Sequence, residues 1–595
     1  MDGKNNGYCE QPLKAESQQK EPSCARHGGE DWACLRDART GRWLLFSRPH
    51  TVIVANRPEE VGGCLREVER LVSRYGGAAA GYLAYEAAPG CDSALPVHPD
   101  PAFPCLSFGV YPQPVPFTLP PVCTPLPYLN WQPTVTKEDY DRAIAKVQAY
   151  IAAGDTYQVN YTYRLRTPCS HDPWHLFATL AGGHEPPEYG GFLQTPDWAI
   201  VSLSPELFFR REGDTISSIP MKGTIGRGLT VAEDLRQAER LANCAKNRAE
   251  NVMIVDMVRN DLTRIAKPET VRTTDLFALH RYPTLWQMVS TVSARTTAPL
   301  ADIFAALFPA ASITGAPKNR TMAIIRELET APRRIYTGTL GFILPDGRSQ
   351  FNVAIRTLLV DRHRSVAEYG VGGGITADST ADDEWQETRI KSLICRGRQP
   401  EFSLLETLLW TPEQGYAYLA EHLQRLLGSA AYFAYPCSET ALRAALDTAA
   451  SGFGSGHQRV RLLLDREGRL QTETTPFNPT DAHRTVRVAL APESIDEGDV
   501  FLYHKTTRRE LYERLRATCG PEAEDVLLYN RRGEVTETTI ANVVATIDGV
   551  EVTPPVHCGL LAGTCRQHLL AAGRLTERIL TIEELRNLGT FSLIN

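Results

Sequence analysis

The sequence predicts a mixed α and β protein made of two fused domains. Runs typical of β-strands alternate with turns from Trp43-Leu44-Leu45-Phe46 onward, and residues 139–153 carry the apolar spacing of an amphipathic helix. After Arg396-Gly397-Arg398-Gln399-Pro400 the pattern of strands and helices starts again. Two units of roughly 350 and 190 residues fit this order better than one.

The elements follow in chain order. We expect a mobile polar extension over residues 1–40, a first domain over 41–395, a linker over 396–401 and a second domain over 402–595. Apolar periodicity predicts helices over 139–153, 248–262 and 421–432, and strands over 336–344 and 351–360. Residues 591–595 resemble the start of a longer segment found at the end of related domains. The second domain is therefore expected to be incomplete at its C-terminal end.

Composition excludes several classes of protein. The 595 residues are 43% hydrophobic and 22% charged, with a net charge of −7 and no basic run, so no nucleic-acid partner is expected. No apolar segment reaches the ~18 residues of a membrane span, and no secretory leader is visible. The fourteen cysteines form no CxxC pair, which favours reduced thiols and a cytoplasmic protein over a zinc site or disulfides.

A lysine is the leading candidate for catalysis. Lys222 lies in Pro220-Met221-Lys222-Gly223-Thr224, sixteen residues after Glu206 of Ser204-Pro205-Glu206. An isolated lysine is usually a solvated surface charge, but desolvation or a nearby cation can leave its amine nucleophilic. A lysine, an acid and distant carboxylates together predict nucleophilic chemistry on an anionic substrate.

Carboxylates and cations elsewhere in the chain suit a metal and an anion. Helical spacing places Glu384, Glu387 and Lys391 on one face, and two adjacent anions repel each other unless a cation lies between them. Arg356 can hold a carboxylate with two parallel hydrogen bonds. The run Gly372, Gly373, Gly374 is expected to leave backbone N–H groups available to an anion.

With these motifs, residues from about 40 to 395 resemble the chorismate-utilising enzymes, which include anthranilate, isochorismate and aminodeoxychorismate synthases. The resemblance implies an α+β fold in which antiparallel sheets form a sandwich flanked by helices. It implies that Lys222 attacks C2 of chorismate, that Glu206 protonates the leaving C4 hydroxyl, and that ammonia then displaces the lysine. It also implies Mg²⁺ ligands (Glu250, Glu384, Glu387) and substrate contacts (Arg356, Lys391, Gly372, Gly373, Gly374, Tyr336, Thr314, Gln158).

Three positions indicate the branch within this family. Anthranilate enzymes usually carry alanine at the position of Lys222 and histidine where Trp286-Gln287-Met288 stands here. Isochorismate enzymes carry a lysine base where this chain has Gln158, and glutamine cannot deprotonate water. All three favour the aminodeoxychorismate branch. One departure concerns the metal: Asn247 replaces a frequent second glutamate, which could weaken metal binding by roughly 10–100-fold.

The last third resembles fold-type IV pyridoxal-phosphate (PLP) enzymes and, among them, aminodeoxychorismate lyase. The motifs are Tyr503-His504-Lys505-Thr506-Thr507-Arg508 and Leu561-Ala562-Gly563-Thr564-Cys565-Arg566, together with Glu537 and Arg425. By resemblance, Lys505 binds PLP covalently, Glu537 pairs with the pyridine nitrogen, and Arg425, Gly563 and Thr564 hold the phosphate. The implied fold is a two-part α/β domain.

Together the two halves imply synthesis of 4-aminobenzoate, a folate precursor, from chorismate. No Gly-x-Cys-x-Gly motif of a glutamine amidotransferase is present, so ammonia is expected from a separate glutaminase subunit or from free ammonium. Three alternatives remain open: an anthranilate synthase component I-like enzyme, a synthase whose second domain is an inactive scaffold, and a non-catalytic binding subunit.

Overall fold

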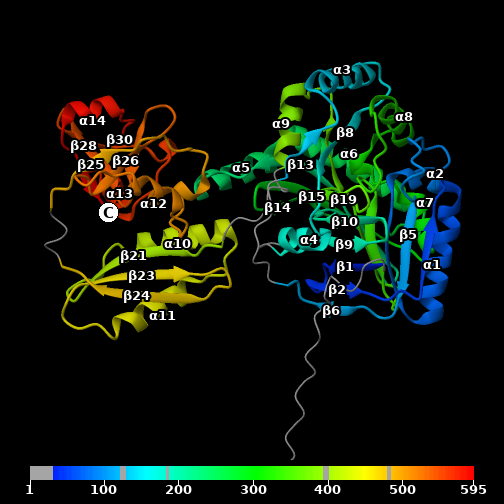
Figure 1. The fold of residues 1–595 in the computed structure, drawn as a ribbon, viewed down its shortest axis with the longest axis horizontal. Coiled ribbons are helices and arrows are strands. Elements are labelled where there is room, and N and C mark those ends of the chain that lie inside the picture. Colours follow the sequence, from blue (N-terminus) through cyan, green and yellow to red (C-terminus); the bar gives the residue numbers. More distant parts are fainter. Residues whose placement is uncertain (1–30, 121–128, 183–185, 393–400, 479–483) are drawn as a thin grey trace, which may run out of the picture. The chain divides into compact units, whose positions relative to one another are not determined.

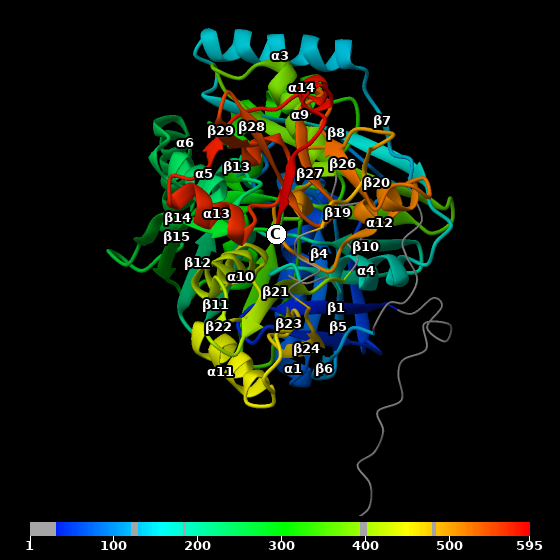
Figure 2. The ribbon, with the colours of Figure 1, turned by 90° about the vertical axis from the view of Figure 1, so that its left-hand side faces the viewer.

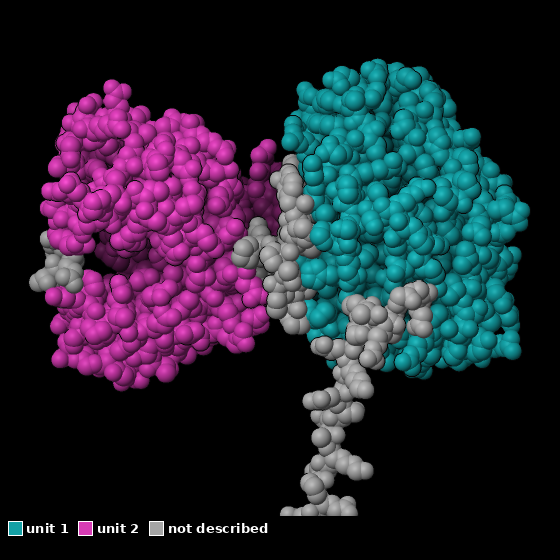
Figure 3. Space-filling view, viewed as in Figure 1, with its two compact units in different colours: residues 1–218, 260–271, 293–397 teal, residues 219–259, 272–292, 398–595 magenta. Residues whose placement is uncertain are grey.

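The computed structural model describes residues 31–120, 129–182, 186–392, 401–478 and 484–595 (Figure 1). Contacts divide the chain into unit 1, residues 1–218, 260–271 and 293–397, and unit 2, residues 219–259, 272–292 and 398–595 (Figure 3). Of the linker expected over residues 396–401, only Glu401 is among the described residues. In the described ranges no helix is both long and apolar enough to span a bilayer.

The first sheet of unit 1 is antiparallel and carries much of the predicted substrate site. Its strands lie in the order β16 (Gly315–Ala316), β8 (Gln158–Pro168), β20 (Val366–Ile375), β19 (Thr357–Asp361), β10 (Trp198–Ser202), β9 (Gly191–Gln194), β1 (Trp32–Asp37), β2 (Arg42–Phe46) and β6 (Val115–Phe117), with β7 (Gln132–Pro133) beside β8. Helices α3 (Lys137–Ala152), α4 (Pro173–Ala181), α8 (Lys318–Leu328) and α9 (Ala381–Ser392) contribute side chains to the apolar cluster on one face of this sheet.

The second sheet of unit 1 packs against the other face of the first. Within unit 1 its order is β12 (Thr215–Ile219), β11 (Leu207–Glu212), β18 (Ser349–Asn352), β17 (Thr339–Ile343), β4 (Ala78–Leu83), β5 (Leu106–Tyr111) and β3 (Thr51–Ala55). Buried residues of both sheets, such as Leu35, Tyr82, Ile200 and Phe342, form one core. Helix α1 (Val61–Tyr75) lies along β5 and contacts α7 (Leu300–Leu307), near the short α2 (Ala88–Cys91) (Figure 1). The expected sandwich of antiparallel sheets with flanking helices is confirmed.

The predicted mobile extension is too long. Residues 32–37 form strand β1, which pairs with β2 and β9, and Cys34 is fully buried. The polar residues before Trp32 concealed this short apolar stretch, whose partner β9 lies far away in the sequence. Residues 1–30 lie outside the described part of the chain.

Unit 2 contains three neighbouring strands and two further sheets. Strand β13 (Met221–Gly226) pairs with β15 (Leu285–Arg295), which also pairs with β14 (Arg272–Arg281); α5 (Val231–Asn243) and α6 (Ala245–Thr263) follow β13 in the chain. The next sheet has the order β22 (Gly415–Tyr416), β21 (Leu404–Thr411), β23 (Gln458–Leu464), β24 (Leu470–Pro476), with α10 (Leu419–Phe433) and α11 (Glu439–Ala450) packed on it (Figures 1 and 2).

The last sheet mixes parallel and antiparallel pairs. Its order is β25 (Val488–Leu490), β26 (Asp525–Tyr529), β27 (Val535–Thr538), β28 (Asn542–Ile547), β29 (Val550–Thr553), β30 (Thr576–Glu577), with β31 (Ser592–Ile594) paired to β28. Helices α12 (Glu510–Ala517), α13 (Thr564–Ala571) and α14 (Ile582–Leu588) complete this two-part α/β region. The helices expected over 139–153, 248–262 and 421–432 are confirmed as α3, α6 and α10.

Candidate active sites

Lys222 lies at a β-bulge. Met221 pairs with Val289 and Thr224 with Gln287, so the register of β13 against β15 slips between them. Gly223 has a φ of +95°, which glycine adopts easily and other residues do not. A bulge re-aims the side chain that it displaces, and Lys222 itself is half-buried. The glycine that follows the lysine in the motif therefore permits the backbone conformation of the bulge.

Side chains from two other elements hold this bulge. The Gln287 amide donates to the carbonyl of Gly223 (2.9 Å) and its carbonyl accepts from the Thr224 hydroxyl (3.0 Å). Asn251 donates to the carbonyl of Lys222 (3.3 Å) and accepts from Ser290 (2.6 Å). A local motif cannot predict these roles, because they depend on the pairing of β13 with β15.

Glu206 is buried in unit 1. The Ser312 hydroxyl donates to its Oε1 at 2.6 Å, and the Ser204 hydroxyl accepts from its backbone N–H at 3.2 Å. Ser312 lies two residues before Thr314, so the stretches that carry Glu206 and Thr314 meet here. Lys222 lies in unit 2.

Strands β16, β8 and β20 bring together Thr314, Gln158 and the glycine run. Gln158 is buried and pairs with Ala316, and the carbonyl of Thr314 accepts from the backbone of Asn160 (2.8 Å). The Oε1 atom of Gln158 is buried without a hydrogen-bond partner among the described residues. An acceptor in that state suits a ligand that donates N–H.

The glycine run is part of a strand. Gly372, Gly373 and Gly374 lie in β20 and pair with Thr162, Tyr161 and Asn160 of β8, so one edge of the run faces a partner strand. The sequence predicts that the backbone N–H groups of this run are available to an anion. Small size matters here for another reason: a Cβ at Gly373 would lie 2.5 Å from Oε2 of Glu384. Gly373 therefore leaves room beside the strand for the carboxylate of Glu384.

Helix α9 presents the predicted carboxylates and lysine to this strand. Lys391 donates to the carbonyl of Gly372 (2.9 Å) and forms an ion pair with Glu387 (2.7 Å). Glu384 accepts from the Ser379 hydroxyl (2.7 Å). Among the residues described, no three His, Cys, Asp or Glu side chains are arranged as a metal site. Glu250 lies in unit 2, so the metal assignment stays a prediction.

Tyr336 and Arg356 lie on loops beside the same sheet. A Cβ at Gly370 would lie 2.1 Å from the ring of Tyr336, which therefore packs directly on the backbone of β20. Burial raises the pKa of Tyr336 to about 12. Arg356 has a φ of +51°, a strained conformation often found at functional sites. This loop also divides the strand expected over 351–360 into β18 and β19.

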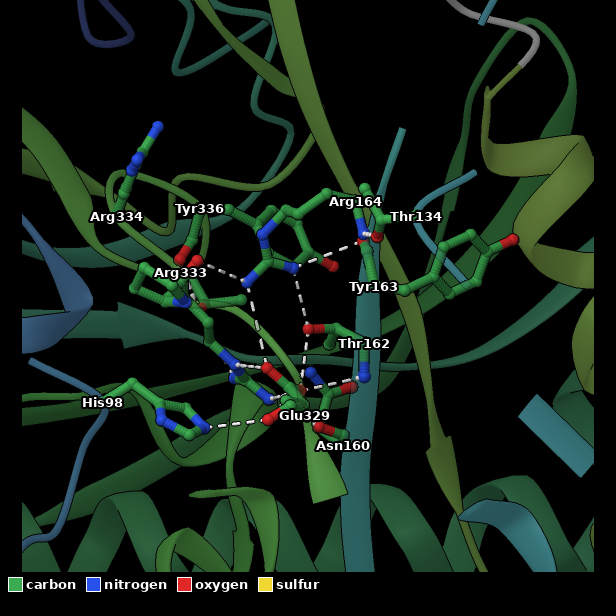
Figure 4. Close-up of polar contacts among 12 residues, drawn as sticks. His98, Thr134, Asn160, Thr162, Tyr163, Arg164, Glu329, Arg333, Arg334 and Tyr336 are labelled. Atoms are coloured by element: carbon green, nitrogen blue, oxygen red, sulfur yellow. Dashed lines mark hydrogen bonds and ion pairs between the residues drawn. The ribbon is translucent and has the colours of Figure 1, made fainter. Parts of the chain in front are cut away.

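A buried ion pair supports the segment that carries Tyr336 (Figure 4). Arg333 donates to Glu329 at 2.6 and 3.0 Å, and Glu329 also accepts from the backbone and hydroxyl of Thr162 (2.9 and 2.8 Å). Arg333 further donates to the carbonyl of Ile313 (3.0 Å). The pair thus joins β8 to the stretches that carry Tyr336 and Thr314. No local motif in the sequence singled out either charged residue.

Lys505 is half-buried in a charged part of unit 2, just before α12. Burial lowers its pKa to about 8, and the cations Arg425 and Arg509 act in the same direction, whereas Glu406 and Glu537 oppose them. A lowered pKa leaves more of the amine neutral at physiological pH, as covalent binding of an aldehyde requires.

Glu537 is a buried carboxyl on β27. It accepts from the Tyr512 hydroxyl (2.9 Å) and from the Asn542 amide (3.3 Å). Burial raises its pKa to about 7, which a cationic pyridine N–H beside it would reverse. Tyr512 and Asn542 were not predicted, since they come from other elements.

The predicted phosphate residues also meet in unit 2. Arg425 on α10 donates to the carbonyl of Ala562 (2.9 Å), and Gly563 is the N-cap of α13. The backbone N–H of Gly563 donates to Asn542, and a Cβ at Gly563 would lie 2.1 Å from the Asn542 Oδ1. A helix N-terminus and a fixed arginine fit the phosphate of PLP, a lysine with lowered pKa fits its aldehyde, and a buried acid fits its pyridine nitrogen.

Two family models match the chain. Residues 124–394 match the chorismate binding enzyme family, and residues 403–595 match the amino-transferase class IV family. Both resemblances that the motifs indicated are confirmed.

Known relatives cover part of the chain. Aminodeoxychorismate synthase component 1 of Salmonella typhimurium is 40% identical over 260 residues, 43% of this chain and 57% of that protein. Anthranilate synthase component 1 1 of Haloarcula marismortui is 41% identical over 255 residues, 42% of this chain and 52% of that protein. The chain thus matches little more than half of the length of these relatives.

A solved structure agrees in fold. Anthranilate synthase component I of Streptococcus pneumoniae superposes with a TM-score of 0.50 at 21% identity, over 65% of this chain and 96% of that one. The chain therefore carries a region that matches the chorismate binding enzyme family, followed by a region that matches the amino-transferase class IV family.

Proposed function

We propose that this chain converts chorismate to 4-aminobenzoate in two steps, one in each domain. The observation that carries the first step is the lysine of Pro-Met-Lys-Gly-Thr on a bulge whose three residues are each held by a side chain. Restraint of this kind suits a nucleophile that must meet a substrate carbon in one orientation.

In the first step, the neutral amine of Lys222 attacks C2 of chorismate while the two conjugated ring double bonds shift and the C4 hydroxyl leaves. Glu206 donates the proton with which that hydroxyl departs as water. Ammonia then attacks C4, both double bonds shift back, and the bond from C2 to the lysine nitrogen breaks. The product is 4-amino-4-deoxychorismate. Gln158 would accept an N–H from the incoming ammonia and cannot activate water in its place.

The two carboxylates of chorismate need fixed cations and donors. We assign Arg356, Lys391 and Tyr336 to them, with Thr314 and the glycines of β20 shaping the site. Mg²⁺ held by Glu250, Glu384 and Glu387 is part of the proposal by family resemblance, and no step is derived through it. A glutamine amidotransferase subunit that supplies ammonia and a cytoplasmic location complete the proposal.

In the second step, the class IV domain eliminates pyruvate from aminodeoxychorismate. PLP, when bound, supplies the electron sink for this elimination. Lys505 would hold the cofactor and move a proton at its amine, Glu537 would keep the pyridine nitrogen protonated, and Arg425, Gly563 and Thr564 would hold the phosphate. Tyr512, through its hydrogen bond to Glu537, would orient that carboxylate.

The test is a product assay on the full chain with chorismate, ammonium, Mg²⁺ and PLP, read by mass and fluorescence. Formation of 4-aminobenzoate with an equal amount of pyruvate supports both steps. Accumulation of aminodeoxychorismate alone supports the first and makes the second domain an inactive scaffold. Anthranilate, the product of the relative from Haloarcula marismortui by its name, would overturn the proposal.

A further inference from the structure

A glutamate that no motif singled out joins two of the phosphate elements. Glu406 lies on β21 with 1% of its surface exposed. Its Oε1 accepts from Nε of Arg425 (2.8 Å), and its Oε2 accepts from Nη2 of the same arginine (2.6 Å). Oε2 also lies 2.7 Å from Nδ1 of His422, one turn earlier on α10. One carboxylate therefore fixes two side chains of one helix face.

The far sides of these two side chains reach the loop that begins α13. Arg425 donates through Nη1 to the carbonyl of Ala562 (2.9 Å). Nε2 of His422 lies 3.3 Å from the hydroxyl of Thr564. Strand β21 and helix α10 are thus linked through Glu406 to the loop at residues 562–564, which lies more than 100 residues further along the chain.

The hydrogen bonds of Arg425 leave some of its N–H groups available for a ligand. A guanidinium has five N–H groups, and here one each on Nε, Nη1 and Nη2 has a partner among the described residues. One N–H on Nη1 and one on Nη2 remain for a further acceptor. A phosphate bound through two parallel hydrogen bonds would use such a pair.

The charge of Glu406 persists at neutral pH. Burial favours the protonated carboxyl, but the attraction of Arg425 and the hydrogen bonds from Arg425 and His422 outweigh it, and the pKa falls to about 2. An anion that is buried and fully partnered holds its cation rigidly, whereas a neutral amide would turn an N–H toward the guanidinium.

We propose that Glu406 is a positioning residue for the phosphate of PLP, which orients Arg425 directly and Thr564 through His422. This inference rests on the proposed PLP function of the domain. Glu406 would contact neither the cofactor nor the substrate, because its two oxygens already accept from Arg425 and His422. Its effect should therefore appear only for ligands that carry the phosphate.

The experiment compares PLP with pyridoxal, which has the same aldehyde and ring and lacks the phosphate. Binding of each to the full chain is titrated by absorbance, and covalent attachment at Lys505 is checked by borohydride reduction and peptide mass. For Glu406→Gln we expect PLP binding to weaken on the order of tenfold to a hundredfold, because charge-assisted hydrogen bonds are lost, while pyridoxal binding changes little. Glu439→Gln, at an exposed ion pair on α11, is the matched control and should behave as wild type.

His422→Asn serves as a second variant in case Glu406→Gln fails to fold, which far-UV circular dichroism without cofactor would reveal. It leaves the pair of Glu406 with Arg425 intact, so a smaller and still phosphate-selective loss is expected. Equal weakening of PLP and pyridoxal in the folded variants would overturn the proposal and assign Glu406 to general packing. A wild-type chain that attaches no PLP at Lys505 would instead refute the proposed function of the domain.

Discussion

Lys222 and Lys505 are both proposed to form covalent bonds, and unit 2 holds them in different ways. Lys222 lies half-buried on a bulge, where side chains bind the carbonyls of Lys222 and Gly223. Lys505 is also half-buried, and it lies among charged groups, which include Arg425. Hydrogen bonds hold the backbone around Lys222, whereas nearby charges set the electrostatic environment of Lys505.

This difference matches the work proposed for each lysine. Lys222 must attack a ring carbon and later leave it, so the orientation of its amine relative to the substrate decides the rate. Lys505 must remain a nucleophile toward an aldehyde at neutral pH, so its proton affinity decides the outcome. If both lysines act as proposed, the restrained backbone would position the amine of Lys222, and a lowered pKa would keep the amine of Lys505 partly neutral.

The largest effect should separate the two lysines completely. Lys222→Ala should lower amination by about a thousandfold or more and leave covalent PLP binding intact, because it removes the nucleophile of one site. Lys505→Ala should abolish the borohydride-stable PLP adduct, keep amination and let aminodeoxychorismate accumulate. Both are read by product mass and peptide mass. Lys246→Ala, an exposed lysine of α6, is the control.

Loss of both amination and PLP attachment in one variant would contradict the independence of the two sites. If Lys222→Ala also prevented PLP attachment, the two sites would depend on each other. If it left amination unchanged, the chain would use the lysine-independent chemistry expected of an anthranilate-type enzyme.

A medium effect should follow when the bulge is loosened and the lysine is kept. Gln287→Ala removes the partner of both Gly223 and Thr224, so the Lys222 amine should sample more orientations. We expect kcat for amination to fall roughly tenfold to a hundredfold with little change in KM for chorismate, since a 1 Å misplacement can have that cost. PLP binding should not change. Asn243→Ala, an exposed amide of α5, is the control. A change in KM alone would mean that Gln287 acts on substrate binding.

The sequence revealed the reactive residues better than the residues that hold them. Lys222 and Lys505 each stand in a contiguous motif, which a single chain displays in full. Gln287 lies 64 residues from Gly223, and Glu406 lies 19 residues from Arg425. Their roles depend on strand register and on which helix face packs against the sheet. A local sequence pattern predicts neither of these.

The same limit applies to the fold. The glycine run of β20 was expected to offer backbone N–H groups to an anion, and its pairing with β8 is not visible in the local sequence. Strand β1 follows a polar segment and was assigned to the mobile extension, and one of its two partners is β9. Strand β8 is distant in the sequence from β20, as β9 is from β1.

The smallest effect concerns the pKa of Lys505. Below the pKa of an amine, its neutral fraction rises tenfold per pH unit, and above the pKa it is constant. With a pKa of about 8, the rate of PLP attachment should rise up to about pH 8 and then level off, whereas a solvated lysine would continue to about 10.4. Arg509→Gln removes one cation that lowers the pKa, so the plateau should move to higher pH by less than about one unit. Arg443→Gln, exposed on α11, is the control.

The groups of PLP also titrate in this range, but they titrate alike with every variant. The shift between Arg509→Gln and wild type therefore isolates the lysine, even where the absolute profile does not. A plateau near pH 10 in the wild type would mean that Lys505 is solvated, and the contrast with Lys222 would then fail. An unshifted plateau in Arg509→Gln, with a low plateau in the wild type, would assign the lowered pKa to burial and Arg425 alone.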